Sequence, residues 1–253
     1  MKYETSFTVR SYETDGHGYL RPTELIRYLQ EVAHRQLLDS GLGYNEMYTE
    51  KHQSFVVARM AIEIYAGAAT NEVLSGGTWI VEDKGANFPR MYDLYCGDRL
   101  ISRATSMWAL VNTETKKLCM REECDLTKHP FGEALELSIP ERLRAPKGVE
   151  MKKVATHRVV LSETDINRHM NNAMYASVFF DLIPNAERYR ITSINLNFRS
   201  EAAYGSDMDI FMSDLIDPEG FDPRAEKVVF FSGENGDKKN ITVAFGLVDE
   251  GEI

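Results

Sequence analysis

The chain has 253 residues, of which 43% are hydrophobic, so it is long enough for one large domain or two small domains with packed cores. Its formal net charge of −10 disfavours nucleic acid or an anionic membrane as the main partner, because the long-range field repels both. No run of about 18 apolar residues and no leader-like segment is visible, so we expect a cytosolic protein with no membrane insertion.

The first half of the chain predicts a short strand, one long amphipathic helix and an antiparallel meander. A β-like run covers residues 7–10, and the helix starts at Pro22, which suits the first helical position, and ends before Gly41. The helix face that repeats every 3.6 residues consists of Leu25, Ile26, Leu29, Val32, Ala33, Gln36 and Leu37. The β-rich runs that follow span residues 55–65, 77–82, 88–96 and 100–111.

The second half predicts the same order of elements. Residues 131–152 contain prolines, a glycine and mixed charges, which is typical of a connector between two domains. A β-like run at residues 158–161 precedes a helix that Asn171 or Asn172 can cap and that ends before Pro184. Because this helix is apolar nearly all round, we expect it to be buried. Further β-rich runs span residues 191–198, 208–212, 228–232 and 241–248.

A short internal repeat supports a duplication. The tripeptide Glu-Thr-Asp at residues 13–15 recurs at residues 163–165, and each copy lies between a β-like run and a helix. A long apolar helix followed by enough strands to wrap it is the hot-dog arrangement. Periodicity by itself predicts only a duplicated α+β fold, so the choice of hot-dog units depends on the motifs described next.

The densest polar cluster of the chain lies between a predicted strand and the apolar helix of the second half. It comprises Asp165, Ile166, Asn167, Arg168, His169, Met170, Asn171 and Asn172. Because Asp165, Asn167 and His169 alternate, an extended turn would place all three on one side. Backbone N–H groups at a helix start carry partial positive charge and can hold an oxygen that becomes negative during acyl transfer. The alternative is that these residues make only ordinary turns and caps.

Glu201 is a second candidate, because its carboxylate follows the strand predicted at residues 191–198. The alternative is an exposed charge at the end of a strand. The first copy holds other residues at the corresponding positions: Gly67 for Glu201, His17 for Asn167 and Tyr19 for His169. The full polar set occurs only in the second copy, which we expect to carry the single active site.

Three segments of the chain carry motifs that occur together in one family. Residues 165–172 follow the pattern Asp-x-Asn-x-His-x-Asn-Asn, residues 194–201 lead from the predicted strand to a glutamate, and residues 106–115 follow Ser-x-Trp-x-x-x-Asn-x-x-Thr. Taken in chain order, the three motifs resemble those of the plant-type and bacterial acyl-acyl-carrier-protein thioesterases. The resemblance covers almost the whole chain. It implies an α+β fold, a tandem double hot-dog in which an antiparallel β-sheet wraps a long central helix in each half.

The resemblance also implies how the halves divide the work. Residues 1–130 are expected to form a degenerate N-terminal hot-dog that contributes the acyl-chain pocket, residues 131–152 the connector, and residues 153–253 the catalytic hot-dog. The expected reaction is hydrolysis of the thioester of fatty acyl-acyl carrier protein to free fatty acid, with no metal or organic cofactor.

The site residues carried over from the family are Asp165, Asn167, His169 and Glu201. Glu201 is the expected general base on water, aided by His169 and Asn167 and with Asp165 orienting the amide and the imidazole. Asp165 and Glu201 could exchange these duties, since neighbouring carboxylates shift each other's pKa. Backbone N–H groups around Asn171 and Asn172 are expected to face the thioester oxygen.

The chain departs from the family pattern at one position. Many plant members have Cys directly after the glutamate, where this chain has Ala202. Its three cysteines, Cys96, Cys119 and Cys124, lack paired spacing, which argues against disulfides and structural zinc and favours ordinary core or strand thiols. We therefore expect the chemistry to use carboxylate, imidazole and amide groups.

The expected partner is an acyl carrier protein that bears a fatty acyl chain, or else acyl-CoA. The sequence leaves open whether the protein also forms a homodimer. Residues 141–158 contain six basic and two acidic residues, a local net charge of +4. This segment is either a solvated linker or a docking patch for an acidic carrier, whose first candidates are Arg142, Arg144, Lys147, Lys152 and Lys153. Three other functions fit the same motifs: an acyl-CoA thioesterase, a hot-dog hydratase or dehydratase, and a non-catalytic acyl-binding regulator.

Overall fold

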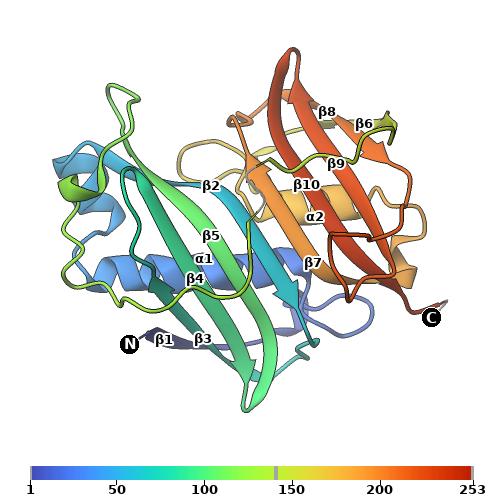
Figure 1. The fold of residues 1–253 in the computed structure, drawn as a ribbon, viewed down its shortest axis with the longest axis horizontal. Coiled ribbons are helices and arrows are strands. Elements are labelled where there is room, and N and C mark those ends of the chain that lie inside the picture. The colour runs from blue at the N-terminus through green and yellow to red at the C-terminus, as the bar shows by residue number, and fades with distance from the viewer. Residues whose placement is uncertain (1, 140–141, 252–253) are drawn as a thin grey trace. The chain divides into compact units, whose positions relative to one another are not determined.

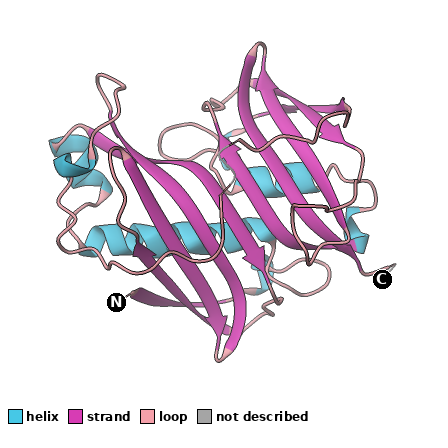
Figure 2. Cartoon of the chain, in the orientation of Figure 1, coloured by secondary structure: helices cyan, strands magenta, loops and turns pink. Residues whose placement is uncertain are grey.

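The computed structural model of the protein describes residues 2–139 and 142–251, which fold into two compact units. One unit comprises residues 1–21 and 25–139, and the other comprises residues 22–24 and 140–253. Each contains a strand, a helix and an antiparallel sheet in the same order (Figure 1, Figure 2). The division between residues 139 and 140 falls inside the segment predicted as a connector.

The N-terminal unit is built from one long helix and an antiparallel sheet. Its helical segments are η1 (Ser11–Glu13), α1 (Pro22–Asp39), η2 (Asn45–Glu50) and η3 (Arg121–Glu123). Its strands are β1 (Tyr3–Thr8), β2 (Gln53–Ile64), β3 (Val73–Ile80), β4 (Asn87–Cys96) and β5 (Arg99–Asn112). They pair in the order β1-β3-β4-β5-β2.

The C-terminal unit repeats this architecture. Its helical segments are η4 (Leu161–Glu163), α2 (Met174–Phe180) and η5 (Ala186–Arg188). Its strands are β6 (Met151–Arg158), β7 (Tyr189–Phe198), β8 (Asp207–Ser213), β9 (Lys227–Asn235) and β10 (Lys238–Asp249). They pair in the order β6-β8-β9-β10-β7, which is the same order, strand for strand, as in the first unit. The predicted duplication is confirmed.

Helix α1 confirms the long amphipathic helix predicted from Pro22. Gly41 follows it with φ 72°, a left-handed conformation that suits glycine, and there the N–H of Leu42 donates to the carbonyl of Leu37 (2.9 Å). All seven side chains of the predicted face are buried, and each apolar one removed from water contributes roughly 1.5–3 kcal/mol. Gln36 accepts a hydrogen bond from the guanidinium of Arg90 in β4 (2.8 Å), which joins the helix to the sheet.

Helix α2 starts later than predicted. It begins at Met174, so neither Asn171 nor Asn172 is its cap. The side-chain oxygen of Asn171 accepts from the N–H of Ala173 (2.9 Å), and its carbonyl accepts from the N–H of Met174 (2.9 Å). These bonds close a separate turn before the helix, because Asn competes for nearby backbone N–H groups.

The core face of α2 is apolar, as predicted. Tyr175, Ala176 and Phe179 are buried, and the ring of Phe179 stacks on Phe231 of β9 with centroids 5.4 Å apart. The expected burial holds for this face only, since Val178 and Phe180 are half-buried.

The β-rich runs predicted after each helix match the observed strands to within four residues. The runs predicted before each helix were placed too late, because β1 ends at Thr8 and β6 ends at Arg158. The reason is local: the N–H of Arg10 donates to Glu13 (2.7 Å), and the N–H of Val160 donates to Glu163 (3.0 Å). Each glutamate thereby holds its segment in the short turns η1 and η4. Among residues 2–139 and 142–251, no helix is long and apolar enough to cross a membrane.

Candidate active site

The polar cluster at residues 165–172 forms the loop between η4 and α2. A side-chain oxygen of Asp165 accepts from the N–H groups of Asn167 (2.8 Å) and His169 (3.4 Å), and its carbonyl accepts from the N–H of Arg168 (3.0 Å). Arg168 adopts a left-handed conformation with φ 62°. The extended turn predicted for these residues is therefore wrong. Asp165 closes the chain into a tight turn, as a short acidic side chain beside free N–H groups does.

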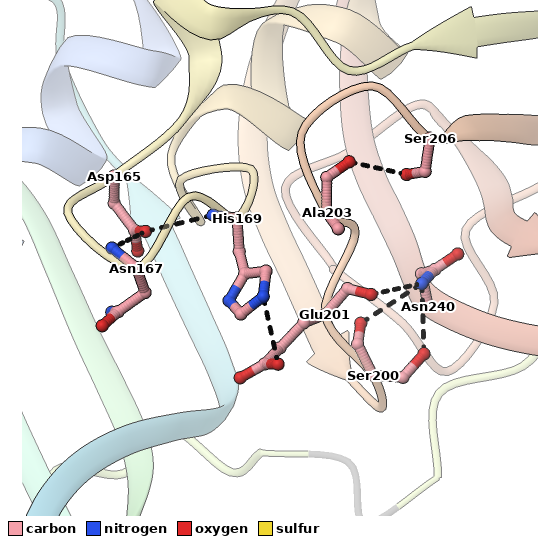
Figure 3. Close-up of polar contacts among 8 residues, drawn as sticks. All are labelled: Asp165, Asn167, His169, Ser200, Glu201, Ala203, Ser206 and Asn240. Atoms are coloured by element: carbon pink, nitrogen blue, oxygen red, sulfur yellow. Dashed lines mark hydrogen bonds and ion pairs between the residues drawn. The ribbon is translucent and has the colours of Figure 1, made fainter.

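His169 and Glu201 meet across two loops of the C-terminal unit. Nε2 of His169 lies 3.4 Å from Oε2 of Glu201 (Figure 3). The glutamate side chain is 72% exposed and the histidine side chain is 30% exposed, so the carboxylate faces solvent and the imidazole is half-buried. The loops are held together by a short antiparallel bridge, in which the N–H of Met170 donates to the carbonyl of Ala202 (2.8 Å).

The structure brings three of the four predicted site residues to one side of the loop. Figure 3 shows the side chains of Asn167 and His169 leaving the loop on the side where Glu201 lies. The carboxylate of Asp165 instead turns back to the backbone of its own loop. Nearby, burial raises the pKa of Tyr175 in α2, and the negative charge of Asp165 raises it further, so this phenol stays neutral.

The backbone N–H groups around Asn171 and Asn172 are mostly occupied. The N–H of Asn171 donates to the carbonyl of Glu163 (2.8 Å), and the two N–H groups after Asn172 both donate to Asn171. Within the described residues, the N–H of Asn172 is the donor of this stretch that has no partner in the protein. Of the N–H groups predicted to face a thioester oxygen, the N–H of Asn172 is therefore the one that remains available.

Asn240 was not predicted to belong to the site. It is buried at the start of β10, and its side-chain amide donates to the carbonyl of Glu201 (3.1 Å) and to the hydroxyl of Ser200 (3.1 Å) (Figure 3). Its own carbonyl accepts from the N–H of Arg199 (2.8 Å). Asn240 thus fixes the backbone that carries Glu201. The signal in the sequence is weak, since Asn240 is one polar residue directly before the apolar run at residues 241–248.

The corresponding loop of the N-terminal unit has the same backbone. A side-chain oxygen of Asp15 accepts from the N–H groups of His17 (3.0 Å) and Tyr19 (3.1 Å), as Asp165 does in the second copy. Gly18, with φ 81°, takes the left-handed position of Arg168. The carboxylate that shapes this turn is therefore common to both copies and is not by itself a mark of an active site.

The side chains of the two copies differ at the positions of the candidate site residues. The N–H of Leu20 donates to the carbonyl of Ala68 (2.7 Å), which corresponds to the bond from Met170 to Ala202. This register confirms that Gly67 occupies the position of Glu201, and Tyr19 that of His169. It also aligns Pro22, which has no N–H, with Asn172.

Comparisons with known proteins agree with this duplicated arrangement. The family model described as acyl-ACP thioesterase N-terminal domain matches residues 1–125, and the one described as acyl-ACP thioesterase C-terminal domain matches residues 147–243. The chain belongs to the acyl-ACP thioesterase family. ACP here denotes acyl carrier protein.

Solved structures with this family name share the fold of the chain. A crystal structure of an acyl-ACP thioesterase from Bacteroides thetaiotaomicron superposes with a TM-score of 0.83 at 22% identity, over 98% of both chains. The 12:0-ACP thioesterase from Umbellularia californica gives a TM-score of 0.80 at 17% identity, over 98% of this chain and 94% of that one. The predicted α+β tandem double hot-dog is confirmed.

Among curated proteins, the chain resembles plant members of the family. It is 26% identical over 239 residues to the chloroplastic oleoyl-acyl carrier protein thioesterase of Coriandrum sativum, which covers 87% of this chain. It is 27% identical over 223 residues to oleoyl-acyl carrier protein thioesterase 2 of Arabidopsis thaliana, which covers 79% of this chain. The chain spans 64% and 60% of the lengths of these two proteins.

The third family motif, residues 106–115, lies on β5 and the turn after it. The indole N–H of Trp108 donates to the hydroxyl of Ser106 (2.6 Å). The side-chain oxygen of Asn112 accepts from the N–H (2.8 Å) and the hydroxyl (3.0 Å) of Thr115. In this member of the acyl-ACP thioesterase family the motif therefore orders the core and the end of a strand.

The three cysteines of this acyl-ACP thioesterase family member are free thiols. All three precede His169 and Glu201 in the chain by more than 40 residues. Cys96 is half-buried at the end of β4, whereas Cys119 and Cys124 are buried in an apolar cluster of the N-terminal unit. Burial raises the pKa of Cys124 to about 11. The prediction of ordinary core or strand thiols is confirmed, with Cys119 and Cys124 in the core and Cys96 in a strand. Within the described residues, no three His, Cys, Asp or Glu side chains are grouped so that they could hold a metal ion.

Proposed function

We propose that this protein hydrolyses the thioester of fatty acyl-acyl carrier protein and releases the free fatty acid. The observation that carries the proposal is the 3.4 Å approach of His169 Nε2 to Glu201 Oε2 in a member of the acyl-ACP thioesterase family. The N–H of Asn172, three residues after His169, has no hydrogen-bond partner among the described residues. An activated water and a donor for the developing oxyanion are what thioester hydrolysis requires.

Glu201 is the proposed general base. Its exposed carboxylate takes a proton from a water molecule, whose oxygen attacks the thioester carbonyl carbon. The carbonyl oxygen becomes negative in the tetrahedral intermediate and is stabilised by the N–H of Asn172. The carbon–sulfur bond then breaks, the sulfur leaves with the proton as a free thiol, and the fatty acid is released.

The other site residues assist this step. His169 contacts the Glu201 carboxylate and orients it, and Asn167 supplies an amide on the same side of the loop. The two backbone hydrogen bonds that Asp165 accepts support a positioning role for it rather than the role of the base. The sequence left open which of the two carboxylates is the base, and we assign that role to Glu201.

The N-terminal unit is proposed to bind the acyl chain. It contains a cavity of about 170 Å³ whose walls include Leu37, Leu42, Met47, Phe55 and Trp108. Apolar and aromatic walls of this kind suit a hydrocarbon chain. The domain limits at residues 130 and 153, and the cytosolic location, stay predictions.

Release of free thiol from a long-chain acyl-acyl carrier protein tests the proposal. The wild-type protein is expected to release thiol and fatty acid in equal amounts. Glu201→Gln is the matched control, because it keeps the size of the side chain and removes its negative charge, and it should release far less of both. Turnover of acyl-CoA without turnover of the carrier-bound substrate would replace the proposed substrate by a CoA thioester. Hydration of an enoyl thioester without thiol release would replace hydrolysis by hydratase chemistry.

A further inference from the structure

A cavity of about 500 Å³ lies in the C-terminal unit, where residues 142–151 run over the sheet toward β6 (Figure 1). Its apolar walls include Leu143, Phe230 and Phe231, which are buried. Leu143 also packs in one core cluster with Phe230 of β9. The segment after residue 141 is therefore anchored on the sheet, and the cavity is part of the packed fold.

Four cationic side chains line this cavity. They are Arg142, Arg144, Arg199 and Lys239. No carboxylate lines it among the described residues. Within that part of the chain the three guanidinium groups form no ion pair, whereas Lys239 lies 3.3 Å from Glu234. In a chain with a net charge of −10, three unpaired guanidinium groups at one cavity favour an anionic ligand.

The structure separates these arginines from the other basic residues of the predicted docking patch. Lys152 lies 3.2 Å from Asp214, and Lys153 lies 2.8 Å from Asp209. Neither lysine lines the cavity. Of the five basic residues of the predicted patch, Arg142 and Arg144 therefore line the cavity, whereas Lys147, Lys152 and Lys153 do not.

The cavity is joined to the loop that carries Glu201. Arg199 is two residues before Glu201, so their Cα atoms are at most about 7 Å apart. Asn240 accepts from the N–H of Arg199 and donates to the carbonyl of Glu201, and Lys239 is its neighbour in β10. One rigid connection thus holds both the cationic side of the cavity and the proposed base.

We propose that this cavity binds the phosphate of the 4′-phosphopantetheine arm that carries the acyl thioester. The inference rests on the proposed function, because that function places a thioester at Glu201 and the arm extends from its sulfur. A guanidinium group offers paired N–H donors that match phosphate oxygens. The apolar walls suit the dimethyl-substituted part of the arm. Acyl carrier proteins and CoA share this arm, so the proposal concerns the phosphate and not the body that follows it.

Kinetics on three thioesters of one fatty acid test the proposal: acyl-acyl carrier protein, acyl-CoA and acyl-pantetheine, which lacks the phosphate. The double variant Arg144→Ala/Arg199→Ala removes two of the three guanidinium groups. It is expected to raise KM about tenfold for the two phosphate-bearing substrates, with kcat unchanged. KM for acyl-pantetheine should stay the same. Arg188→Ala is the matched control, since Arg188 is paired with Asp249 outside the cavity and should change none of these values.

Two results would overturn the phosphate site. A rise in KM for the carrier-bound substrate alone would mean that the arginines contact the carrier protein itself. An equal rise for acyl-pantetheine would mean that they act on the fold or on the thioester.

Calorimetric titration with 4′-phosphopantetheine and with pantetheine separates this inference from the proposed function. We expect the wild-type protein to bind the phosphorylated compound more tightly, and the double variant to bind the two compounds alike. Preferential binding without hydrolysis of any thioester would keep the cavity assignment and refute the proposed function. Hydrolysis without preferential binding would keep the function and refute the phosphate site.

Discussion

The ring of Tyr19 lies directly against Gly67, so closely that a Cβ on residue 67 would be 2.5 Å from Cδ1 of the tyrosine. In the C-terminal unit the corresponding pair is His169 and Glu201, whose side chains meet at 3.4 Å. An aromatic ring thus fills the space that a carboxylate occupies in the second copy. The first copy has the same turn and, at these two positions, neither the imidazole nor the carboxylate.

The two copies should therefore respond differently to substitution. Glu201→Gln and His169→Ala are each expected to lower kcat by on the order of 10²-fold or more, the usual scale for losing a general base or its electrostatic support. Asp15→Asn and His17→Ala should leave kcat nearly unchanged and lower the free energy of unfolding by up to about 1 kcal/mol, because Asp15 shapes a turn. The measurements are kcat on one acyl thioester and thermal unfolding followed by circular dichroism. Equal losses in both copies would indicate two working sites.

A proline at residue 172 should remove the proposed oxyanion donor with little other change. The first copy has Pro22 at the corresponding position, where it is the first residue of α1, and circular dichroism checks that the variant is folded. Asn172→Pro is expected to lower kcat about 10²-fold to 10³-fold, the loss usual for one oxyanion-hole donor. Asn172→Ala keeps the N–H and serves as the control, with kcat within a few fold of the wild type. Similar kcat values for the two folded variants would assign the oxyanion to another donor.

Hydrolysis should survive saturating alkylation of thiols while the native structure is retained. Ala202 follows the proposed base where many plant members of the family have Cys, and two of the three cysteines are buried. The pKa of about 11 at Cys124 keeps that thiol protonated and slow to react at neutral pH. Activity is measured after treatment with iodoacetamide, with circular dichroism as the check on folding. The same treatment is applied to Cys96→Ser. Complete loss of activity in both proteins, with the fold intact, would refute the carboxylate mechanism.

His129 should make the N-terminal unit sensitive to acid. It is 6% exposed, and neither ring nitrogen has a hydrogen-bond partner among the described residues. Burial, with the positive charges of Arg90 and Arg121, lowers the pKa of His129 from 6.5 to about 4. The unfolded chain therefore binds a proton that the folded protein excludes between about pH 6.5 and pH 4.

This difference in proton binding fixes the direction of the effect. The contribution of His129 to the free energy of unfolding is complete above about pH 6.5 and is lost progressively toward pH 4, by up to roughly 3 kcal/mol. Urea unfolding of the wild type and of His129→Leu, each at about pH 7.5 and about pH 4.5, isolates this contribution. The variant should lose less stability on acidification. An equal loss in both proteins would mean that His129 is protonated in the folded state.

The sequence by itself determined the repeated order of elements and pointed to the candidate site residues. Helix α1 and the meander strands were predictable because their apolar periodicity is local. Glu201 and His169 could be named as candidates because two copies of one unit could be compared, and because three motifs occur in the order of one family. The start of α2 and the ends of β1 and β6 were misplaced, since single side chains such as Glu13, Glu163 and Asn171 capture backbone N–H groups there.

Only the tertiary structure decided how the site is held. The approach of His169 to Glu201 depends on the bridge from Met170 to Ala202, and the backbone of Glu201 depends on Asn240 in another strand. The sequence also could not show that the carboxylate of Asp165 is occupied by its own loop or that three arginines converge on one cavity. Some of these relations join residues that are far apart in the chain, and others depend on which of several acceptors an N–H group bonds. Sequence periodicity predicts neither, because it records only which face of an element is buried.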